Sequence, residues 1–214
     1  MMSAESAACW LKEHLNVTRE TIERLKQYES LICKWNPTIN LVGRASLPHI
    51  WQRHILDSAQ IWPLRPHSAR CWLDLGSGGG FPGLVVAVLA ADLQPDLTVV
   101  LVESDVRKAS FLLQASQILG ISTKIHQERV EFLHPQSADV ISARAVAPLD
   151  KLLHYAERHL AKNAVCLLQK GKSCGSELTQ AQKYWKFEVQ KIPSVTDSGG
   201  VVLKIGGLGR VEPE

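Results

Sequence analysis

The chain has few cysteines, and none of them form a C-x-x-C pair. The five thiols, Cys9, Cys33, Cys71, Cys166 and Cys174, are scattered and odd in number. This pattern argues against a disulfide framework or a zinc site and fits a reducing cytosol. We therefore expect no bound metal and a cytoplasmic location.

Long apolar runs and a strong charge imbalance are also missing. No apolar run reaches the roughly 20 residues needed to cross a bilayer, and residues 1–10 lack the basic start and apolar core of a signal peptide. The net charge is +3 in 214 residues, which permits a nucleic-acid partner without requiring one. We expect a monomer that does not associate with membranes, with one main domain and at most a small appendage.

Residues 1–62 are predicted to form a helical extension packed on the core. Apolar side chains fall at helical spacing at Ile22, Leu25, Tyr28, Ile32 and Trp35. We expect Asn36-Pro37 to end this helix, because a residue before proline is pushed out of the α region. A second amphipathic helix covers 47–55, with Ser46 as its expected N-cap.

From residue 70 the pattern changes to alternating strands and helices. Apolar strand-like runs lie at 71–75, 98–102, 123–126, 138–142 and 164–169, and helical segments lie at 82–91, 105–119, 148–160 and 174–183. Two further strand-like runs, 185–191 and 200–205, are predicted to form a hairpin. This alternation predicts an α/β, Rossmann-like domain over 63–214, with a mostly parallel seven-stranded sheet and helices on both faces.

A glycine-rich turn follows the first strand, where α/β folds bind nucleotide-like ligands. The dinucleotide fingerprint G-x-G-x-x-G needs a sixth-position glycine, but counting from Gly76 that place holds Phe81. A phosphate loop before Gly171-Lys172-Ser173 would need glycine where Cys166 stands. Neither of these two signatures is complete.

The spacing of Asp74, Gly76, Gly78 and Gly80 resembles the first motif of class I S-adenosylmethionine-dependent methyltransferases. Glycines leave room for a ligand against bare backbone, and Asp74 is positioned in the sequence to interact with a cationic amine. Glu103, after the next strand, can accept hydrogen bonds from two ribose hydroxyls and would repel a 2′-phosphate. At this point NAD, or a tight turn beside a solvated glutamate, remains an alternative.

Further elements occur along residues 28–177 in a fixed order. They are Trp35-Asn36-Pro37 with Ile39-Asn40-Leu41, His54-Ile55-Leu56-Asp57-Ser58, Phe81-Pro82-Gly83, Glu103-Ser104 with Arg107-Lys108 and Phe111-Leu112, Arg129-Val130-Glu131, Ala143-Arg144-Ala145, and Lys170-Gly171. Together they resemble the RsmG family, also called glucose-inhibited division protein B. The tail departs from that family, because Gly206 to Arg210 and the acidic Glu212 and Glu214 replace a basic ending.

The resemblance implies a methyltransferase that uses S-adenosylmethionine to methylate N7 of one guanine in bacterial 16S rRNA, within a small-subunit ribosomal particle or precursor. It implies cofactor contacts from Gly76, Gly78, Phe81, Val130, Glu131 and Arg144, to which physical reasoning adds Glu103. Guanine N7 carries a lone pair and no proton, so no general base is required, and we expect no catalytic cysteine, histidine or metal.

Basic residues near these elements are candidate RNA contacts. They are Arg44, Arg53, His54, Arg107, Lys108, Lys170 and Lys172. For the lysines a solvated face is an alternative, for His54 a packed and satisfied side chain, and for Arg144 a salt bridge. Two functional alternatives also stay open: a methyltransferase of a non-RNA substrate, and a nucleotide-binding regulator without transferase activity.

Overall fold

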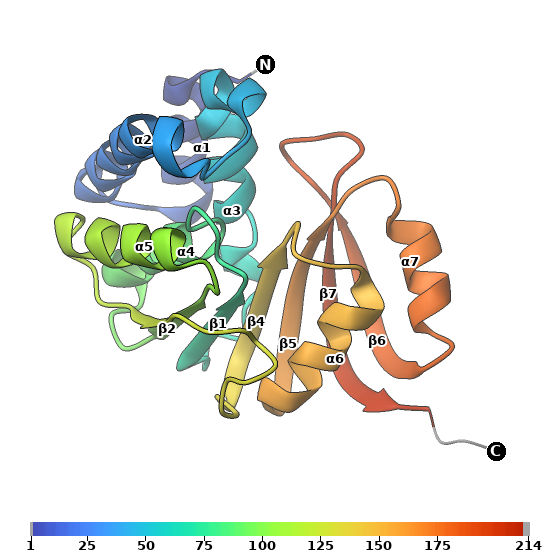
Figure 1. The fold of residues 1–214 in the computed structure, drawn as a ribbon. Coiled ribbons are helices and arrows are strands. Elements are labelled where there is room, and N and C mark those ends of the chain that lie inside the picture. The colour runs from blue at the N-terminus through green and yellow to red at the C-terminus, as the bar shows by residue number, and fades with distance from the viewer. Residues whose placement is uncertain (1, 212–214) are drawn as a thin grey trace.

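A computed structural model describes residues 2–211 as one sheet with helices on both faces (Figure 1). The sheet order is β3-β2-β1-β4-β5-β7-β6. Its strands are β1 (Cys71–Leu75), β2 (Thr98–Val102), β3 (Lys124–His126), β4 (Ala138–Arg144), β5 (Leu160–Lys170), β6 (Trp185–Pro193) and β7 (Val201–Arg210). Strands β1 to β5 pair in parallel, whereas β7 runs antiparallel to both β5 and β6. The predicted seven-stranded α/β fold and the terminal hairpin are confirmed.

The unusual glycines of the tail belong to this sheet. Residues 206–209 lie within β7, which pairs with β6 along most of its length. Glu212 and Glu214 lie outside the described residues.

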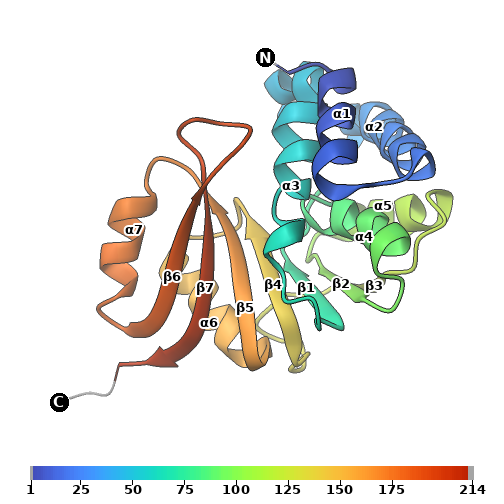
Figure 2. The same cartoon turned by 180° about the vertical axis from the view of Figure 1, so that it is seen from behind.

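Helices cover the two faces of the sheet in separate sets (Figures 1 and 2). One face carries α4 (Gly83–Leu93), α5 (Val106–Ile118) and the N-terminal helices, and the other carries α6 (Leu149–His159) and α7 (Cys174–Ala181). Side chains alternate along β1, so Trp72 enters the first core while Leu73 and Leu75 enter the second.

The N-terminal region is helical throughout and shares the first core. Its elements are α1 (Ala4–Leu15), α2 (Arg19–Ile39), η1 (Arg44–His49), η2 (Trp51–Leu56), α3 (Asp57–Ala59) and η3 (Trp62–Leu64). Leu25 and Ile55 of this region are fully buried in the same cluster as Leu84 and Val88 of α4. These helices therefore pack on the sheet domain through a continuous apolar core.

Helix α2 does not end at Asn36-Pro37, so that prediction is wrong. The helix runs through Pro37 to Ile39 and ends at Asn40, which is left-handed with φ 52°. Pro37 is tolerated because it lies in the last turn, and the carbonyl that its missing N–H cannot bond belongs to Cys33, an exposed residue. The Asn40 amide donates to the Asn36 carbonyl at 3.0 Å and closes the helix.

The second predicted helix is also built differently. It begins after Gly43 and runs as a 3-10 turn (η1), a π-helical turn (η2) and one α turn (α3). Ser46 lies inside η1 rather than at its N-cap, and its hydroxyl donates to the Gly43 carbonyl at 2.7 Å. The change of helical pitch brings His54 of η2 back onto the Ser46 hydroxyl at 2.8 Å.

Two further expectations concern membranes and metals. Within residues 2–211, no helix is both long enough and apolar enough to cross a bilayer. The same range holds no group of three or more His, Cys, Asp or Glu side chains arranged to bind a metal ion.

Candidate functional site

The register of the sheet brings three predicted residues to one edge. Leu75, the last residue of β1, pairs with Val102 of β2 on one side and with Ala143 of β4 on the other. Gly76, Glu103 and Arg144 each follow one of these paired residues. The strand order also reverses between β1 and β4, and open α/β sheets bind ligands outside the strand ends at such a point.

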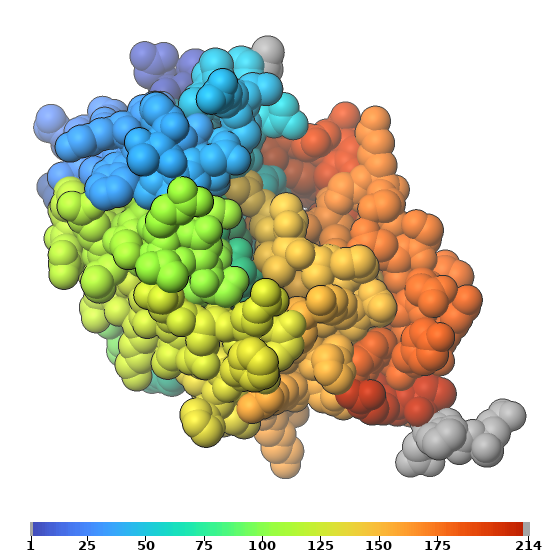
Figure 3. All heavy atoms as spheres, viewed as in Figure 1, coloured from blue at the N-terminus to red at the C-terminus, as the bar shows by residue number. Residues whose placement is uncertain are grey.

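A cleft of about 1620 Å³ opens at this edge. It is walled by the N-terminal helical region, the glycine loop, the loop after β4 and the β6–β7 loop. Figure 3 shows the surface hollowed between the blue and cyan N-terminal region and the orange and red C-terminal region. Small-molecule pockets usually measure roughly 300–1,000 Å³, so this cleft has room for a cofactor and a second reactant.

The glycine loop is held in a shape that only glycine fits. Gly76 has φ 64°, and a Cβ there would stand 2.7 Å from the Val146 side chain. The N-terminal region fixes the other side of the loop, because the Tyr28 hydroxyl donates to the Gly79 carbonyl at 2.5 Å. A Cβ on Gly79 would meet the Leu41 carbonyl oxygen at 3.0 Å, so the chain after α2 packs directly on this loop.

Glu103 lies at the cleft wall with both carboxylate oxygens oriented by backbone amides. Oε2 accepts from the Gly78 amide and Oε1 from the Asp105 amide, each at 2.8 Å. The residue is only 8% exposed. An ionised carboxylate has about four acceptor sites, so each oxygen keeps capacity for a ligand hydroxyl.

Asp74 is not placed to meet a cationic amine, contrary to the sequence-based expectation. Its carboxyl is fully buried beneath the loop, where Oδ1 accepts from the Ser142 hydroxyl at 2.6 Å and Oδ2 from the Gly83 amide at 3.2 Å. Burial raises its pKa to about 6, against the opposing effect of those hydrogen bonds. Asp74 instead ties β1 to β4 and to the start of α4.

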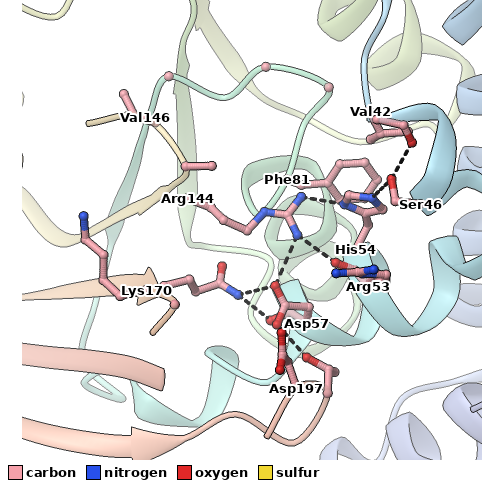
Figure 4. Close-up of a pocket in the computed structure, with 18 of the residues that line it drawn as sticks. Val42, Ser46, Arg53, His54, Asp57, Phe81, Arg144, Val146, Lys170 and Asp197 are labelled. Carbon is pink, nitrogen blue, oxygen red and sulfur yellow. Dashed lines mark hydrogen bonds and ion pairs between the residues drawn. The ribbon is translucent and has the colours of Figure 1, made fainter. Parts of the chain in front are cut away.

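Arg144 is the centre of the polar network at the floor of the cleft (Figure 4). Its Nη2 donates to Nδ1 of His54 at 2.8 Å, and its Nη1 donates to Oδ2 of Asp57 at 3.2 Å and to the Arg53 carbonyl at 3.0 Å. The Phe81 ring packs against the His54 ring, with centroids 4.9 Å apart. The alternative that Arg144 forms a salt bridge is therefore correct, and its partner is Asp57. Arg144 also lines the cleft.

His54 is a neutral acceptor at this point. Burial, followed by the charges of Arg144 and Arg53, lowers the pKa of His54 to about 3. The neutral ring accepts a hydrogen bond from Arg144 at Nδ1 and donates one from Nε2 to the Ser46 hydroxyl. The alternative expected for His54 is therefore correct: the side chain is packed and both ring nitrogens have hydrogen-bond partners. The ring also lines the cleft.

Asp57 is the functional candidate that the sequence reasoning missed. Besides Arg144, it accepts from Nε2 of Gln169 on β5 at 2.7 Å and from the Thr196 hydroxyl in the β6–β7 loop at 2.7 Å. It therefore joins three segments far apart in the chain. The available signal was its spacing three residues after His54, which puts both side chains on one helix face.

Two predicted cofactor residues, Val130 and Glu131, are not among the residues that line the cleft. Val130 is 8% exposed and packs in the core beneath α6. The Glu131 carboxylate accepts the Tyr155 hydroxyl at 2.6 Å, a bond that lowers its pKa. A contact from either residue to the cofactor stays a prediction.

The predicted RNA contacts are divided in space. Arg53 and Lys108 line the cleft, whereas Arg44, Arg107 and Lys172 are exposed side chains outside its lining. Lys170 lines the cleft but lies in an internal ion pair, 2.8 Å from Glu177 and with its side chain 9% exposed. The alternative of a solvated Lys170 ammonium is therefore wrong, whereas contact between Lys170 and RNA stays a prediction.

Comparison with known proteins identifies close relatives. A family model described as rRNA small subunit methyltransferase G (GidB) matches residues 21–201. The ribosomal RNA small subunit methyltransferase G of Cereibacter sphaeroides is 50% identical over 203 residues, which are 95% of this chain and 98% of the relative. The protein of the same name from a Ruegeria species is 48% identical over 92% of this chain and 96% of its own length.

The fold has counterparts among solved structures. A methyltransferase from Geobacter sulfurreducens superposes with a TM-score of 0.57 at 15% sequence identity, over 86% of this chain and 90% of that one. At that identity the likeness concerns the fold, which is the Rossmann-like arrangement expected from the alternating strands and helices.

Proposed function

Because the chain belongs to the rRNA small subunit methyltransferase G family, we propose that it transfers a methyl group from S-adenosylmethionine to N7 of a guanine in 16S rRNA. One observation carries the proposal. The region matched by the family model, 21–201, contains all the residues that line the cleft at the carboxyl ends of β1, β2 and β4 except Val202.

The residues at this edge fit S-adenosylmethionine. The left-handed glycines at 76 and 78 leave backbone uncovered where a side chain would collide or strain the loop. Glu103 presents a carboxylate with free acceptor capacity, which suits a ribose diol. Phe81 adds an apolar ring beside this loop.

S-adenosylmethionine supplies an electrophilic methyl group on a sulfonium. The protein positions the two reactants and sets the charge of the cleft wall around them. Guanine N7 needs no deprotonation, so the side chains at the cleft floor have to align the base rather than move a proton. Transfer leaves the guanine cationic. Asp57 lies at this floor and balances the Arg144 guanidinium, which keeps the wall from repelling a positive product.

The substrate in this proposal is a small-subunit ribosomal particle or precursor in the bacterial cytoplasm, bound by a monomeric enzyme. Arg53 and Lys108 both line the cleft and are the phosphate contacts proposed at its wall. Arg44, Arg107 and Lys172 are proposed as contacts farther out. Because the chain's net charge is only +3, the shape of the folded RNA must contribute to selection.

The proposal is tested by mapping N7-methylguanine on 16S rRNA by base-specific cleavage in a strain with and without this gene. We expect one modified guanine to disappear on deletion, and to return with the wild-type gene but not with Gly76→Asp. Unchanged methylation after deletion would refute the proposal. Cofactor binding without any RNA methylation would favour the regulatory alternative, and methylation of another molecule would favour the non-RNA alternative.

A further inference from the structure

The loop after β4 is strained and lies against the glycine loop. Residues 145–148 join β4 to α6 and line the cleft. Ala145 has φ 55°, a left-handed conformation that residues other than glycine rarely adopt. Val146 packs so closely on Gly76 that a Cβ there would stand 2.7 Å from it. Such a conformation persists only where surrounding contacts enforce it.

Lys170 and Glu177 provide these contacts from β5 and α7. The Lys170 ammonium donates to the Ala147 carbonyl at 2.9 Å and to Oε2 of Glu177 at 2.8 Å. The same Oε2 accepts the Leu149 amide at 2.9 Å, at the first turn of α6. The ion pair therefore holds the loop at Ala147 and at the helix start that follows it.

The ion pair is largely shielded from solvent. The side chains of Lys170 and Glu177 are 9% and 20% exposed, so salt screens their attraction less than that of a surface pair. Oε1 of Glu177 accepts the Ser173 hydroxyl at 2.7 Å, which fixes the carboxylate further. Two of the three Lys170 donors are engaged inside the protein.

We propose that Lys170 and Glu177 are positioning residues that clamp loop 145–148 over the glycine loop, so that the target base is held in line with the methyl group. This inference rests on the proposed methyl transfer. It assigns to Lys170 a role through the protein backbone, in place of contact with an RNA phosphate. Loosening the loop shifts one wall of the cleft in which the reactants are proposed to bind, and a misplacement of about 1 Å can cost up to about 100-fold in rate.

The test compares Lys170→Met, Lys170→Arg and Glu177→Gln with Lys183→Met, which removes the same charge from an exposed site after α7. Purified variants are assayed for kcat and KM on small ribosomal subunits, for the salt dependence of subunit binding, and for amide hydrogen exchange of residues 145–149. For Lys170→Met we expect kcat to fall at least about tenfold, KM and salt dependence to stay unchanged, and amide exchange of the loop to accelerate.

Lys170→Arg should recover much of the rate, and Lys183→Met should match the wild type. The double variant Lys170→Met/Glu177→Gln should be no worse than Lys170→Met, because the two residues act as one clamp. Two results for Lys170→Met would overturn the inference. One is a raised KM with unchanged kcat and a weaker salt dependence of subunit binding, which marks a phosphate contact. The other is amide exchange of residues 145–149 at the wild-type rate. Amide exchange of the loop is measured without RNA. It therefore tests whether Lys170 and Glu177 hold the loop even if the proposed RNA substrate is wrong.

Discussion

Replacing Asp57 by asparagine isolates the charge that balances Arg144. The amide has nearly the same shape as the carboxylate, but it cannot satisfy the network. Oδ2 accepts from both Arg144 and Gln169, and Oδ1 accepts from both Gln60 and Thr196. Whichever way the asparagine amide turns, its NH2 group faces donors, so at least one bond to a nitrogen donor is lost.

The size of the effect follows from the geometry. A separation of 3.2 Å between Nη1 and Oδ2 corresponds to about 5 kcal/mol of attraction at an effective dielectric constant of about 20. Both side chains are 17% exposed, and we take desolvation to offset about half of that attraction, which leaves about 2–3 kcal/mol. If that energy positions Arg144 for the reaction, kcat/KM falls about 30- to 160-fold.

The assay is steady-state methylation of small ribosomal subunits, with cofactor affinity measured by calorimetry and folding by urea titration. Asp197→Asn is the matched control, because Asp197 also lines the cleft but its carboxylate accepts from the Gly199 amide rather than from Arg144. The reasoning fails if Asp57→Asn stays within about threefold of the wild type. It also fails if Asp197→Asn loses as much activity.

Three further changes test other parts of the site. Gly76→Ala should weaken cofactor binding at least about tenfold by calorimetry, because its Cβ would collide with Val146. Gly175→Ala is the control and should bind the cofactor normally, because an added Cβ at Gly175 meets no atom of residues 2–211 within 4 Å. Tyr28→Phe should lower the free energy of unfolding by about 1–2 kcal/mol in urea, since it leaves the Gly79 carbonyl without its donor. Folding lowers the pKa of His54 from 6.5 to about 3, so the stability that comes from keeping this ring neutral is complete above pH 6.5 and is lost as pH falls toward 3. His54→Gln should therefore flatten the curve of unfolding free energy against pH between pH 6.5 and 3. An unchanged slope would contradict this reasoning.

Much of the fold could be predicted because its signals are local. The central strands β1 and β2 are short, mostly apolar runs, and the turn from β1 into α4 is marked by glycines that adopt left-handed backbone. The same locality explains why Gly76, Glu103 and Arg144 were found, since each follows a recognisable strand. Parallel register then places all three at one edge without further information.

The wrong predictions have two origins: one overlooks a helix cap close in sequence, and the others concern residues whose partners lie far away in sequence. Pro37 is accommodated because α2 ends one turn later at Asn40, a cap that the proline rule ignores. Asp74 was expected at the ligand, but its partner Ser142 lies on β4, 68 residues away. Asp57 gains its importance from Gln169 and other groups more than 80 residues away, and no local pattern shows those partners.

The most direct measurement combines the purified chain, S-adenosylmethionine with an isotopically labelled methyl group, and small ribosomal subunits from a strain lacking the gene. The account predicts incorporation of a single methyl group per particle, recovered as N7-methylguanosine at one position of the 16S rRNA, and its loss with Arg144→Ala. Label on another atom, on another molecule, or on no product at all would contradict it.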